Sequence, residues 1–497
     1  MNLDSWLPPL LLASSLVPGL VIFTLREEQR GLRTLLNLAG AFIKLGLVVF
    51  MLWGVYHGHT YETTISFLPG LNLTFRAAPL PMLFITLSAL LWLVTTVYAI
   101  GYLEGSSNRS RFFGFFSLCV SSTVGIALAG DLLALLVFYE MLTLTTYPLV
   151  VHRGTEQSIR AGRAYLAYTL TGSVVLLFAI AWLYALTGDL CFQEAGRLSG
   201  LPEQDAPALR VIFTMLILGF GVKAALVPLH GWLPQAMVAP APVSALLHAV
   251  AVVKAGAFGI VRIVSDVYGI EFANELGVLT PLAVVASVTI IYGSLRALAQ
   301  DDLKKRLAFS TVSQVSYIAL GVSLGTPLAT IGGIVHLVHQ GLMKITLFFC
   351  AGNFAERLHI HRISEMDGVG RKMPWTMAAF TIGAFGMIGV PPLAGFVTKW
   401  YLATGALEAG QPWVIGVLAA SSLLNAGYFL PILYRGWFRP ADDTVQNEDS
   451  SGSEIAWTLL APPMITASLA LVAGLFAASG FSPLAWAEVI TAREFGS

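Results

Sequence analysis

Long apolar segments alternate with short polar connections along the whole chain. Fourteen of the segments are long enough to cross about 30 Å of hydrocarbon as helices. They cover residues 5–25, 34–54, 80–103, 112–130, 132–151, 164–187, 209–229, 241–264, 276–297, 307–324, 329–354, 375–401, 412–434 and 456–479. The pattern predicts an all-α polytopic membrane protein with about 14 transmembrane helices.

Composition supports this class and excludes others. Of 497 residues, 56% are apolar and only 11% are charged, which leaves too little polar surface for a soluble domain. The net charge is zero, so nothing indicates a nucleic-acid partner. Cys119, Cys191 and Cys350 are scattered without a CxxC pair, which predicts no disulfide framework and no zinc or iron-sulfur site. We therefore expect no cofactor and no redox or hydrolytic site in this chain, although it could serve an enzyme complex.

The positive charges indicate how the chain crosses the bilayer. Eighteen of the 28 lysines and arginines fall in loops after odd-numbered segments, and five fall in the loops on the other side. Because lysine and arginine are retained on the cytoplasmic side, both termini are predicted to lie outside, as in a bacterial-type plasma membrane protein. Asp4 precedes the first segment and Arg26 follows it, which favours an anchor over a cleaved signal.

The remaining five positive charges lie inside predicted spans, and all are lysines: Lys44, Lys223, Lys254, Lys344 and Lys399. A charge at bilayer depth costs roughly 2.5 to 3.5 kcal/mol, which argues that five of them have a use. Desolvation lets a lysine lose its proton, whereas arginine stays charged. The lysines are therefore candidates for passing protons.

A structural interpretation of the lysines is weaker but stays open. They could pair with carboxylates to join helices, or extend toward an interface. Only Glu140 lies deep in a span, however, with Asp131 near the entrance of the same span, and one carboxylate cannot neutralise five lysines. For Lys44, which no motif surrounds, the structural and functional interpretations are equally supported.

Histidines continue the polar series. His248 shares the eighth span with Lys254, and His336, His339 and Lys344 share the eleventh. His336 and His339 are about one turn apart on a helix, which indicates a proton relay. A metal site is the alternative for these two, but no suitable third ligand is close in sequence. For His248 the alternative is a histidine simply packed against another helix.

Prolines interrupt two of the spans. Those near the seventh span are Pro228 and Pro234, and those in the twelfth are Pro391 and Pro392. Broken membrane helices are tolerated where they line a polar cavity, and their freed backbone groups can hold water or ions. The motif PLHGW at 228–232 is repeated as PLAGF at 392–396, five spans later and in the opposite direction. We therefore expect two inverted five-helix repeats, spans four to eight and nine to thirteen.

This division predicts four regions. Residues 1–111 form an N-terminal three-helix region, 112–264 the first repeat, 265–434 the second repeat, and 435–497 a loop with a C-terminal transmembrane helix. One detail departs from simple symmetry. Lys223 precedes its proline, whereas Lys399 follows its pair of prolines.

Three stretches resemble a known family: GDLLALLVFYEMLTLTTYPLV, GVKAALVPLHGWLPQAMVAPAPVSALLHAVAVVKAG and GVPPLAGFVTKW. The chain is similar over nearly its whole length to the antiporter-like membrane subunits of Mrp-type cation/proton antiporters, respiratory complex I and membrane-bound hydrogenases. The resemblance implies fourteen helices with two inverted repeats. It also implies that Glu140 pairs with Lys223, and that Lys254 and Lys399 occupy the family's lysine positions of the eighth and twelfth spans.

Two positions depart from the family pattern. Many members carry a second histidine four residues after the one that matches His336, where this chain has Gln340; Lys344 matches. His339 is the candidate substitute. Ala78 stands where many relatives carry aspartate, which removes a polar group at the entry to the third span.

Together these features predict a proton-translocating subunit of a multisubunit membrane complex. Glu140 and Lys223 form the input, Lys254 and His336 relay, and Lys399 releases protons on the other side. Sodium requires several oxygen ligands, and Glu140 with a few threonine hydroxyls offers little. Sodium would then pass through another subunit or an interface.

The resemblance also indicates which complex the chain belongs to. Chain length and the lysine of the twelfth span favour the D-type subunit of an Mrp antiporter. A complex I or hydrogenase-type subunit is the first alternative. A stand-alone solute carrier and a scaffold that transports nothing are the others.

Overall fold

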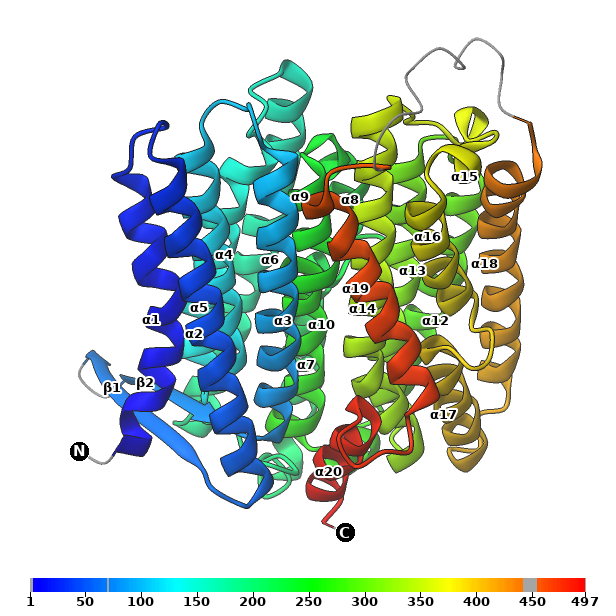
Figure 1. Ribbon diagram of the computed structural model, residues 1–497. Coiled ribbons are helices and arrows are strands. Elements are labelled where there is room, and N and C mark those ends of the chain that lie inside the picture. Colours follow the sequence, from blue (N-terminus) through cyan, green and yellow to red (C-terminus); the bar gives the residue numbers. More distant parts are fainter. Residues whose placement is uncertain (1–2, 69–70, 441–453, 497) are drawn as a thin grey trace.

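Roughly parallel helices make up most of the chain (Figure 1). The computed structural model describes residues 3–68, 71–440 and 454–496. The long helices of the first half are α1 (Leu3–Phe23), α2 (Arg30–Tyr56), α3 (Pro79–Tyr102), α4 (Arg109–Leu128), α5 (Leu132–Val150), α6 (Glu156–Thr187), α7 (Ala206–Ala224) and α10 (Val252–Arg262). Those of the second half are α12 (Leu279–Leu298), α13 (Leu303–Ser323), α14 (Pro327–Leu358), α16 (Pro374–Ile388), α17 (Ala394–Glu408), α18 (Trp413–Phe438) and α19 (Trp457–Leu475).

Short elements join these helices. They are the strands β1 (Tyr61–Leu68) and β2 (Leu71–Ala77), the helices α8 (Trp232–Gln235), α9 (Ala241–Ala245), α11 (Ile270–Glu275), α15 (Val369–Lys372) and α20 (Pro483–Glu494), the 3₁₀ turns η1 (Glu203–Asp205), η2 (Ala236–Val238) and η5 (Ile363–Glu365), and the π-helical segments η3 (Leu246–Val250) and η4 (Ile263–Tyr268). Side chains fix several helix starts. Asp131 accepts a hydrogen bond from the Ala134 N–H at the start of α5, and Asp302 accepts one from Lys305 at the start of α13.

The prediction of an all-α polytopic membrane protein is confirmed. Among the described residues, 12 helices are long and apolar enough to cross a membrane. The two other predicted spans are also helical. One is α13, whose first turns carry charges, and the other is divided between α16 and α17. The inverted repeats and the four-region division remain predictions, and residues 441–453 of the predicted loop lie outside the described part of the chain.

Two helix breaks interrupt this framework at the predicted places. At the first break, residues 225–231, α7 ends at Ala224 and Ala225 has a left-handed backbone with φ 59°. At the second break, residues 389–393, α16 ends at Ile388 and Gly389 has φ 91°. Pro228, Pro391 and Pro392 lie within these breaks, whereas Pro234 lies inside the short helix α8.

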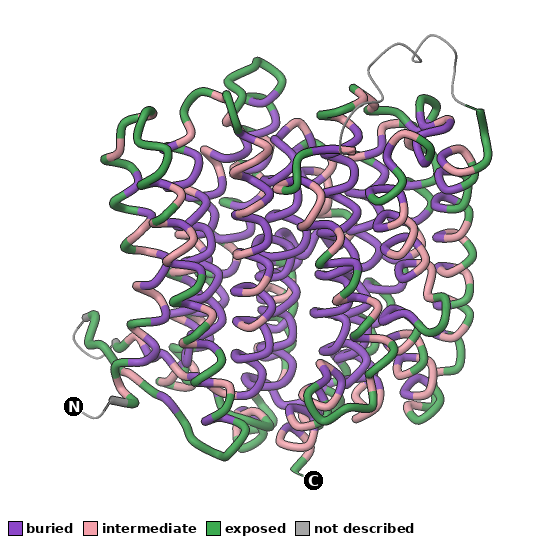
Figure 2. The backbone as a smooth tube through the Cα atoms, viewed as in Figure 1, coloured by how far each residue is buried: buried purple, intermediate pink, exposed green. Residues whose placement is uncertain are grey.

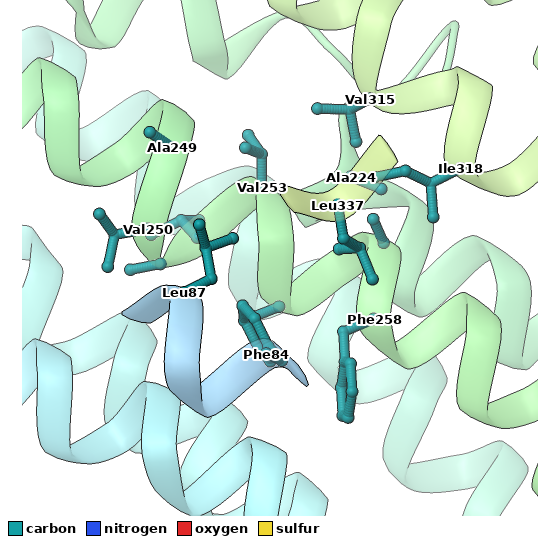
Figure 3. Packing of buried hydrophobic residues seen from close by; sticks show 14 of the residues in the cluster. Phe84, Leu87, Ala224, Ala249, Val250, Val253, Phe258, Val315, Ile318 and Leu337 are labelled. Atoms are coloured by element: carbon teal, nitrogen blue, oxygen red, sulfur yellow. The ribbon is translucent and has the colours of Figure 1, made fainter. Parts of the chain in front are cut away.

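The centre of the molecule is formed by two helical stretches, Ala241–Tyr268 and Pro327–Leu358, whose apolar segments are buried throughout (Figure 2). Around them, apolar side chains from α3, α7, α10, α13 and α14 interdigitate (Figure 3). Gly256 lets α10 approach α7 closely, since a Cβ at this position would overlap the Ala224 nitrogen. Close backbone approach of this kind is how helices pack where lipid gives no hydrophobic drive.

Both termini lie on one face of the molecule, which we call the terminal face (Figure 1). The β1–β2 hairpin and α20 lie there, and the apolar pattern predicts neither of them. In the hairpin, Tyr61 pairs with Ala77 in an antiparallel register. An even number of crossings is required to bring both ends to one side, which agrees with the predicted 14.

Candidate functional site

All five predicted intramembrane lysines are enclosed by neighbouring helices. Lys44, Lys223, Lys254 and Lys344 are completely buried, and Lys399 is half-buried. None forms an ion pair within 4.0 Å in the part of the chain that the structure describes. Their ammonium groups donate instead to backbone carbonyls and hydroxyls. A buried ammonium requires such acceptors, because desolvation without them costs several kcal/mol.

Lys223 lies in the last turn of α7 and is directed at α5. Its Nζ donates to the Tyr139 carbonyl at 2.5 Å and lies 3.3 Å from the centre of the Tyr139 ring, a cation–π contact. Glu140, the next residue on α5, acts electrostatically on Lys223. The two side chains do not touch, because the half-buried Glu140 accepts a hydrogen bond from the Ser173 hydroxyl on α6. The predicted pair is therefore a charge pair without direct contact.

The threonines near Glu140 serve the local structure. The hydroxyls of Thr143 and Thr145 donate to carbonyls one turn earlier in α5. Thr145 and Thr146 also contact the buried Cys119 sulfur, at 3.4 Å each. Their oxygens are thus occupied within the helix pair α4–α5.

Lys254 connects α10 to the central helix α14. Its Nζ donates to the Leu337 carbonyl at 2.7 Å, next in sequence to His336. Figure 3 shows the apolar side chains of Val253 and Leu337 on these two helices. His336 lies beside the Tyr317 ring, with 5.2 Å between ring centres, and Lys254, His339 and Lys399 all act on it electrostatically. Lys254 and Lys399 therefore both lie within electrostatic range of His336.

His339 links the same group to the second break. Its Nδ1 lies 3.0 Å from the Thr398 hydroxyl, the residue before Lys399. Lys399 in turn donates to the Ile388 carbonyl at 2.6 Å and to the Ser422 hydroxyl at 2.7 Å. Both ring nitrogens of His336, and Nε2 of His339, lack hydrogen bonds of good geometry among the described residues. Buried polar atoms of this kind are ordinarily satisfied by water.

His248 and Lys344 form a separate branch. The His248 ring stacks on Phe348 with 4.4 Å between centres, and Lys344 acts on it electrostatically. Lys344 donates to the Ser310 hydroxyl and to the Leu307 carbonyl on α13. Gln340, at the position where relatives of the resembled family have histidine, is buried with no side-chain partner among the described residues.

Lys44 lies away from the other lysines, near the N-terminus. Its Nζ donates to the Ser15 hydroxyl on α1 at 2.6 Å and lies 5.0 Å from the ring centre of Trp92 on α3. The structure therefore joins it to the N-terminal helices rather than to the central group.

Side chains donate hydrogen bonds to backbone carbonyls at both breaks. The Trp232 indole donates to the Val222 carbonyl at 2.7 Å beside the first break. At the second, Asn425 donates to the Met387 carbonyl at 2.9 Å, and Lys399 to that of Ile388. That these groups also hold water or ions stays a prediction.

Sequence reasoning missed three groups. Lys304 belongs to a loop by the apolar pattern, yet its Nζ donates to the Ala239 carbonyl at 2.6 Å and acts electrostatically on His248. Tyr139 provides both the carbonyl and the ring for Lys223, and its place directly before Glu140 was the available signal. Arg262 and Asp266 form a buried ion pair at 2.7 Å, at the predicted end of the eighth span.

Metal ligands are not gathered in the described residues, where no group of three or more His, Cys, Asp or Glu could hold an ion. His336 and His339 are directed at different neighbours, Tyr317 and Thr398.

Comparisons with known proteins agree with this architecture. Residues 129–425 match a family model described as "NADH:quinone oxidoreductase/Mrp antiporter, TM". The chain is 38% identical over 359 residues to NADH-quinone oxidoreductase subunit N of Desulforudis audaxviator, which covers 71% of each chain. It is 28% identical over 395 residues to the D-type subunit of a Na(+)/H(+) antiporter of Bacillus subtilis, covering 79% of this chain and 78% of that one.

A solved structure shows the same fold. A chain of the Mrp complex from Dietzia sp. superposes with a TM-score of 0.86 at 24% identity, covering 100% of this chain and 98% of that one.

Proposed function

Because this chain belongs to the NADH:quinone oxidoreductase/Mrp antiporter family of membrane subunits, we propose that it translocates protons as one subunit of a multisubunit complex. The observation that carries the proposal is the series of lysines without ion-pair partners among the described residues of the buried centre. Each donates to neutral acceptors, so each can lose its proton without leaving an unpaired buried carboxylate.

The proposed path follows the electrostatic contacts. Glu140 stabilises the protonated form of Lys223 at the input. Lys254 and His336 relay, and Lys399 releases protons near the second break. Protonation of one member raises the cost of protonating the next, so a charge change in a partner subunit can drive the series. His339 extends this path, while His248, Lys344 and Lys304 form a side branch that reaches the face opposite the termini.

The assembly we propose is an Mrp-type cation/proton antiporter, with this chain as its D-type subunit. The length match to the Bacillus subtilis antiporter chain and the lysine at position 399 support it. A second candidate is a redox-driven complex, which the 38% identity to a NADH-quinone oxidoreductase subunit favours. In the first case sodium would cross at another subunit or an interface.

Neutralising Glu140 tests proton translocation. The complex is purified through a tag on this chain, its other membrane subunits are identified, and proton movement in liposomes is followed with a pH-sensitive dye. Glu140→Gln removes the charge that supports Lys223, so transport should fall at least about tenfold, or about 1.4 kcal/mol in barrier, with assembly intact. The matched control is Glu275→Gln at an exposed position.

Three outcomes are informative. Wild-type transport by Glu140→Gln at normal expression would overturn the proposed pair. Proton movement driven by a sodium gradient would select the antiporter, and movement driven only by electron donors would select the redox complex. Full transport by this chain purified alone would instead indicate a solute carrier.

We also propose that the chain lies in a bacterial-type plasma membrane with its terminal face outward. The lysine and arginine distribution supports this orientation. In a Cys191→Ser background, which removes the exposed native thiol, single cysteines near Arg160, Lys304 or Arg371 should react only from the cytoplasm. Cysteines near Arg76 or Glu203 should react only from outside, and any reversed pair would disprove the 14-span topology.

A further inference from the structure

A small polar cavity lies at the terminal face, apart from the lysine series. Its volume is about 30 Å³, room for one or two water molecules. Three arginines and three carboxyl groups line it: Arg76, Arg262, Arg493, Glu194, Asp266 and Glu494. They come from β2, the end of the span Ala241–Tyr268, the loop before α7, and α20. Four elements distant in sequence thus contribute charge to one small volume.

The floor of the cavity is buried. Arg262 and Asp266 are one turn apart, with 2.7 Å between Nη1 and Oδ2, and their side chains are only 5% and 4% exposed. Arg262 also donates to the Ala129 carbonyl at 3.0 Å and lies 4.0 Å from the Phe192 ring centre. Its guanidinium is therefore held in place by the end of α4 and by the loop before α7.

Helix α20 brings a second carboxyl group to this floor. Glu494 is 7% exposed and accepts a hydrogen bond from the Ala195 N–H at 3.0 Å. Glu494 and Asp266 line the same cavity, and Asp266 acts on Glu494 electrostatically. Burial raises the pKa of the Glu494 carboxyl, and the negative charge of Asp266 raises it further. Two carboxyl groups that line one small cavity do not both ionise readily.

The other charges at the cavity have partners of their own. Arg76 pairs with Glu62 at 2.7 Å, and Arg493 pairs with Glu194 at 3.5 Å. These four side chains are 36% to 48% exposed, and the three that line the cavity, Arg76, Arg493 and Glu194, form its rim toward solvent. Among the charges that line the cavity, Arg262 therefore remains to balance both Asp266 and Glu494. One positive charge neutralises one carboxylate, so the other carboxyl group is expected to keep its proton.

We propose that Asp266 and Glu494 form a proton-binding site at the terminal face, holding one proton between them beside Arg262. Glu494 carries the proton, and its O–H group donates a hydrogen bond to Asp266. The guanidinium of Arg262 stabilises the negative charge of Asp266. On release, the O–H bond of Glu494 breaks, the proton passes to a water molecule in the cavity, and both carboxylates remain. Uptake is the reverse. The site then exchanges protons with solvent at the terminal face.

Two side-chain atoms at the cavity have hydrogen-bonding capacity left for water. Nε of Arg262 lacks a hydrogen bond of good geometry among the described residues, and Oδ2 of Asp266 has only its ion-pair contact with Nη1 of Arg262; both belong to cavity-lining side chains. They can bond to water in the cavity, which connects the buried pair to the exposed rim. Any contribution of this site to transport rests on the proposed function, but its binding of a proton does not.

The test is therefore a titration of the resting complex. Infrared difference spectra are recorded between about pH 7 and about pH 10, a range in which ordinary carboxyl groups are already ionised. The wild type should lose the C=O stretch of one protonated carboxyl group per subunit as pH rises. Glu494→Gln should lack this band, and the matched control Glu488→Gln, on the exposed side of the same helix, should keep it.

If Glu494→Gln does not assemble, the variant Asp266→Asn tests the site instead. In Asp266→Asn, the remaining Glu494 lies beside Arg262 without a competing carboxylate, so it should ionise at least about one pH unit lower, a tenfold change in proton affinity. A wild-type spectrum without the band, or a band unchanged in either variant, would overturn the site. Loss of transport with an intact band would count against the proposed function alone.

Discussion

The two helix breaks place a lysine beside similar proline-containing turns, yet the lysines do different work. Lys399 lies after the second break and turns back to it, donating to the Ile388 carbonyl at the end of α16. Lys223 lies before the first break and turns away, toward the Tyr139 carbonyl and ring on α5. At the first break, the Trp232 indole donates to the Val222 carbonyl, which also accepts from the Ala225 N–H.

This difference shows how one residue type serves two requirements. The last carbonyls of a helix need donors and favour a positive charge, so Lys399 stabilises the end of α16 while it stays half-exposed. Lys223 has no such duty, because the indole of Trp232 performs it. Lys223 can therefore respond to Glu140.

The largest effect that would test this comparison is expected for Lys223→Arg. An arginine can keep the charge near Glu140 but has no accessible neutral form, since its pKa is above about 12. The subunit should assemble, and transport in vesicles containing the full complex should fall to background, with Lys305→Arg as an exposed control. Expression is checked by blot. Near-normal dye quenching would make Lys223 a fixed charge and remove the central step of the path.

Lys399→Arg should lose transport as well, but with a smaller defect than at Lys223. The guanidinium can still donate to the carbonyls at the end of α16, so the thermal midpoint of the complex should be preserved. Only proton release should fail. Transport and thermal unfolding are measured on the same preparation, and Lys399→Met separates the two roles by lowering both. If Lys399→Arg transports normally, the lysine acts only as a helix cap.

The fold was predictable to a large extent, because apolar runs of about 20 residues leave the backbone few options in lipid. The lysines were found by the same reasoning. Their acceptors were not, since the carbonyls of Tyr139, Leu337 and Leu307 belong to other helices and carry no sequence signal. The proline positions located both breaks to within a few residues. They did not identify Ala224 as the end of α7, four residues before Pro228.

Elements outside the apolar runs were missed for a different reason. Strands β1 and β2 alternate polar and apolar positions, and such strands contain too few consecutive apolar residues to stand out among membrane spans. Helix α20 has only 12 residues, and Asp266 lies two residues beyond the predicted span. These are the parts that build the cavity at the terminal face. These elements come together through tertiary contacts, which a local sequence pattern does not reveal.

A smaller effect is expected when the second break loses its glycine. Gly389 has φ 91°, and a Cβ there would lie 2.8 Å from Cδ of Lys399 and 3.1 Å from its Nζ. Gly389→Ala therefore adds backbone strain of about 1 to 2 kcal/mol and displaces Lys399 from its carbonyls. Transport should fall several-fold and the thermal midpoint should drop. Gly416→Ala, where nothing lies within 4 Å of the added methyl, is the control.

The smallest effect is expected at the corresponding position of the first break, where an alanine already occupies the left-handed region. Ala225 has φ 59°, so Ala225→Gly relieves strain of about 1 to 2 kcal/mol but increases the freedom of the unfolded chain by about 0.5 to 1 kcal/mol. The two terms nearly cancel, and the side chain of Lys223 keeps its Tyr139 contacts because they do not involve residue 225. We expect a thermal midpoint equal to or slightly above that of the wild type, with unchanged transport. A several-fold loss of transport in Ala225→Gly would show that the first break, like the second, controls its lysine through the backbone, and the functional difference between the two breaks would then be disproved.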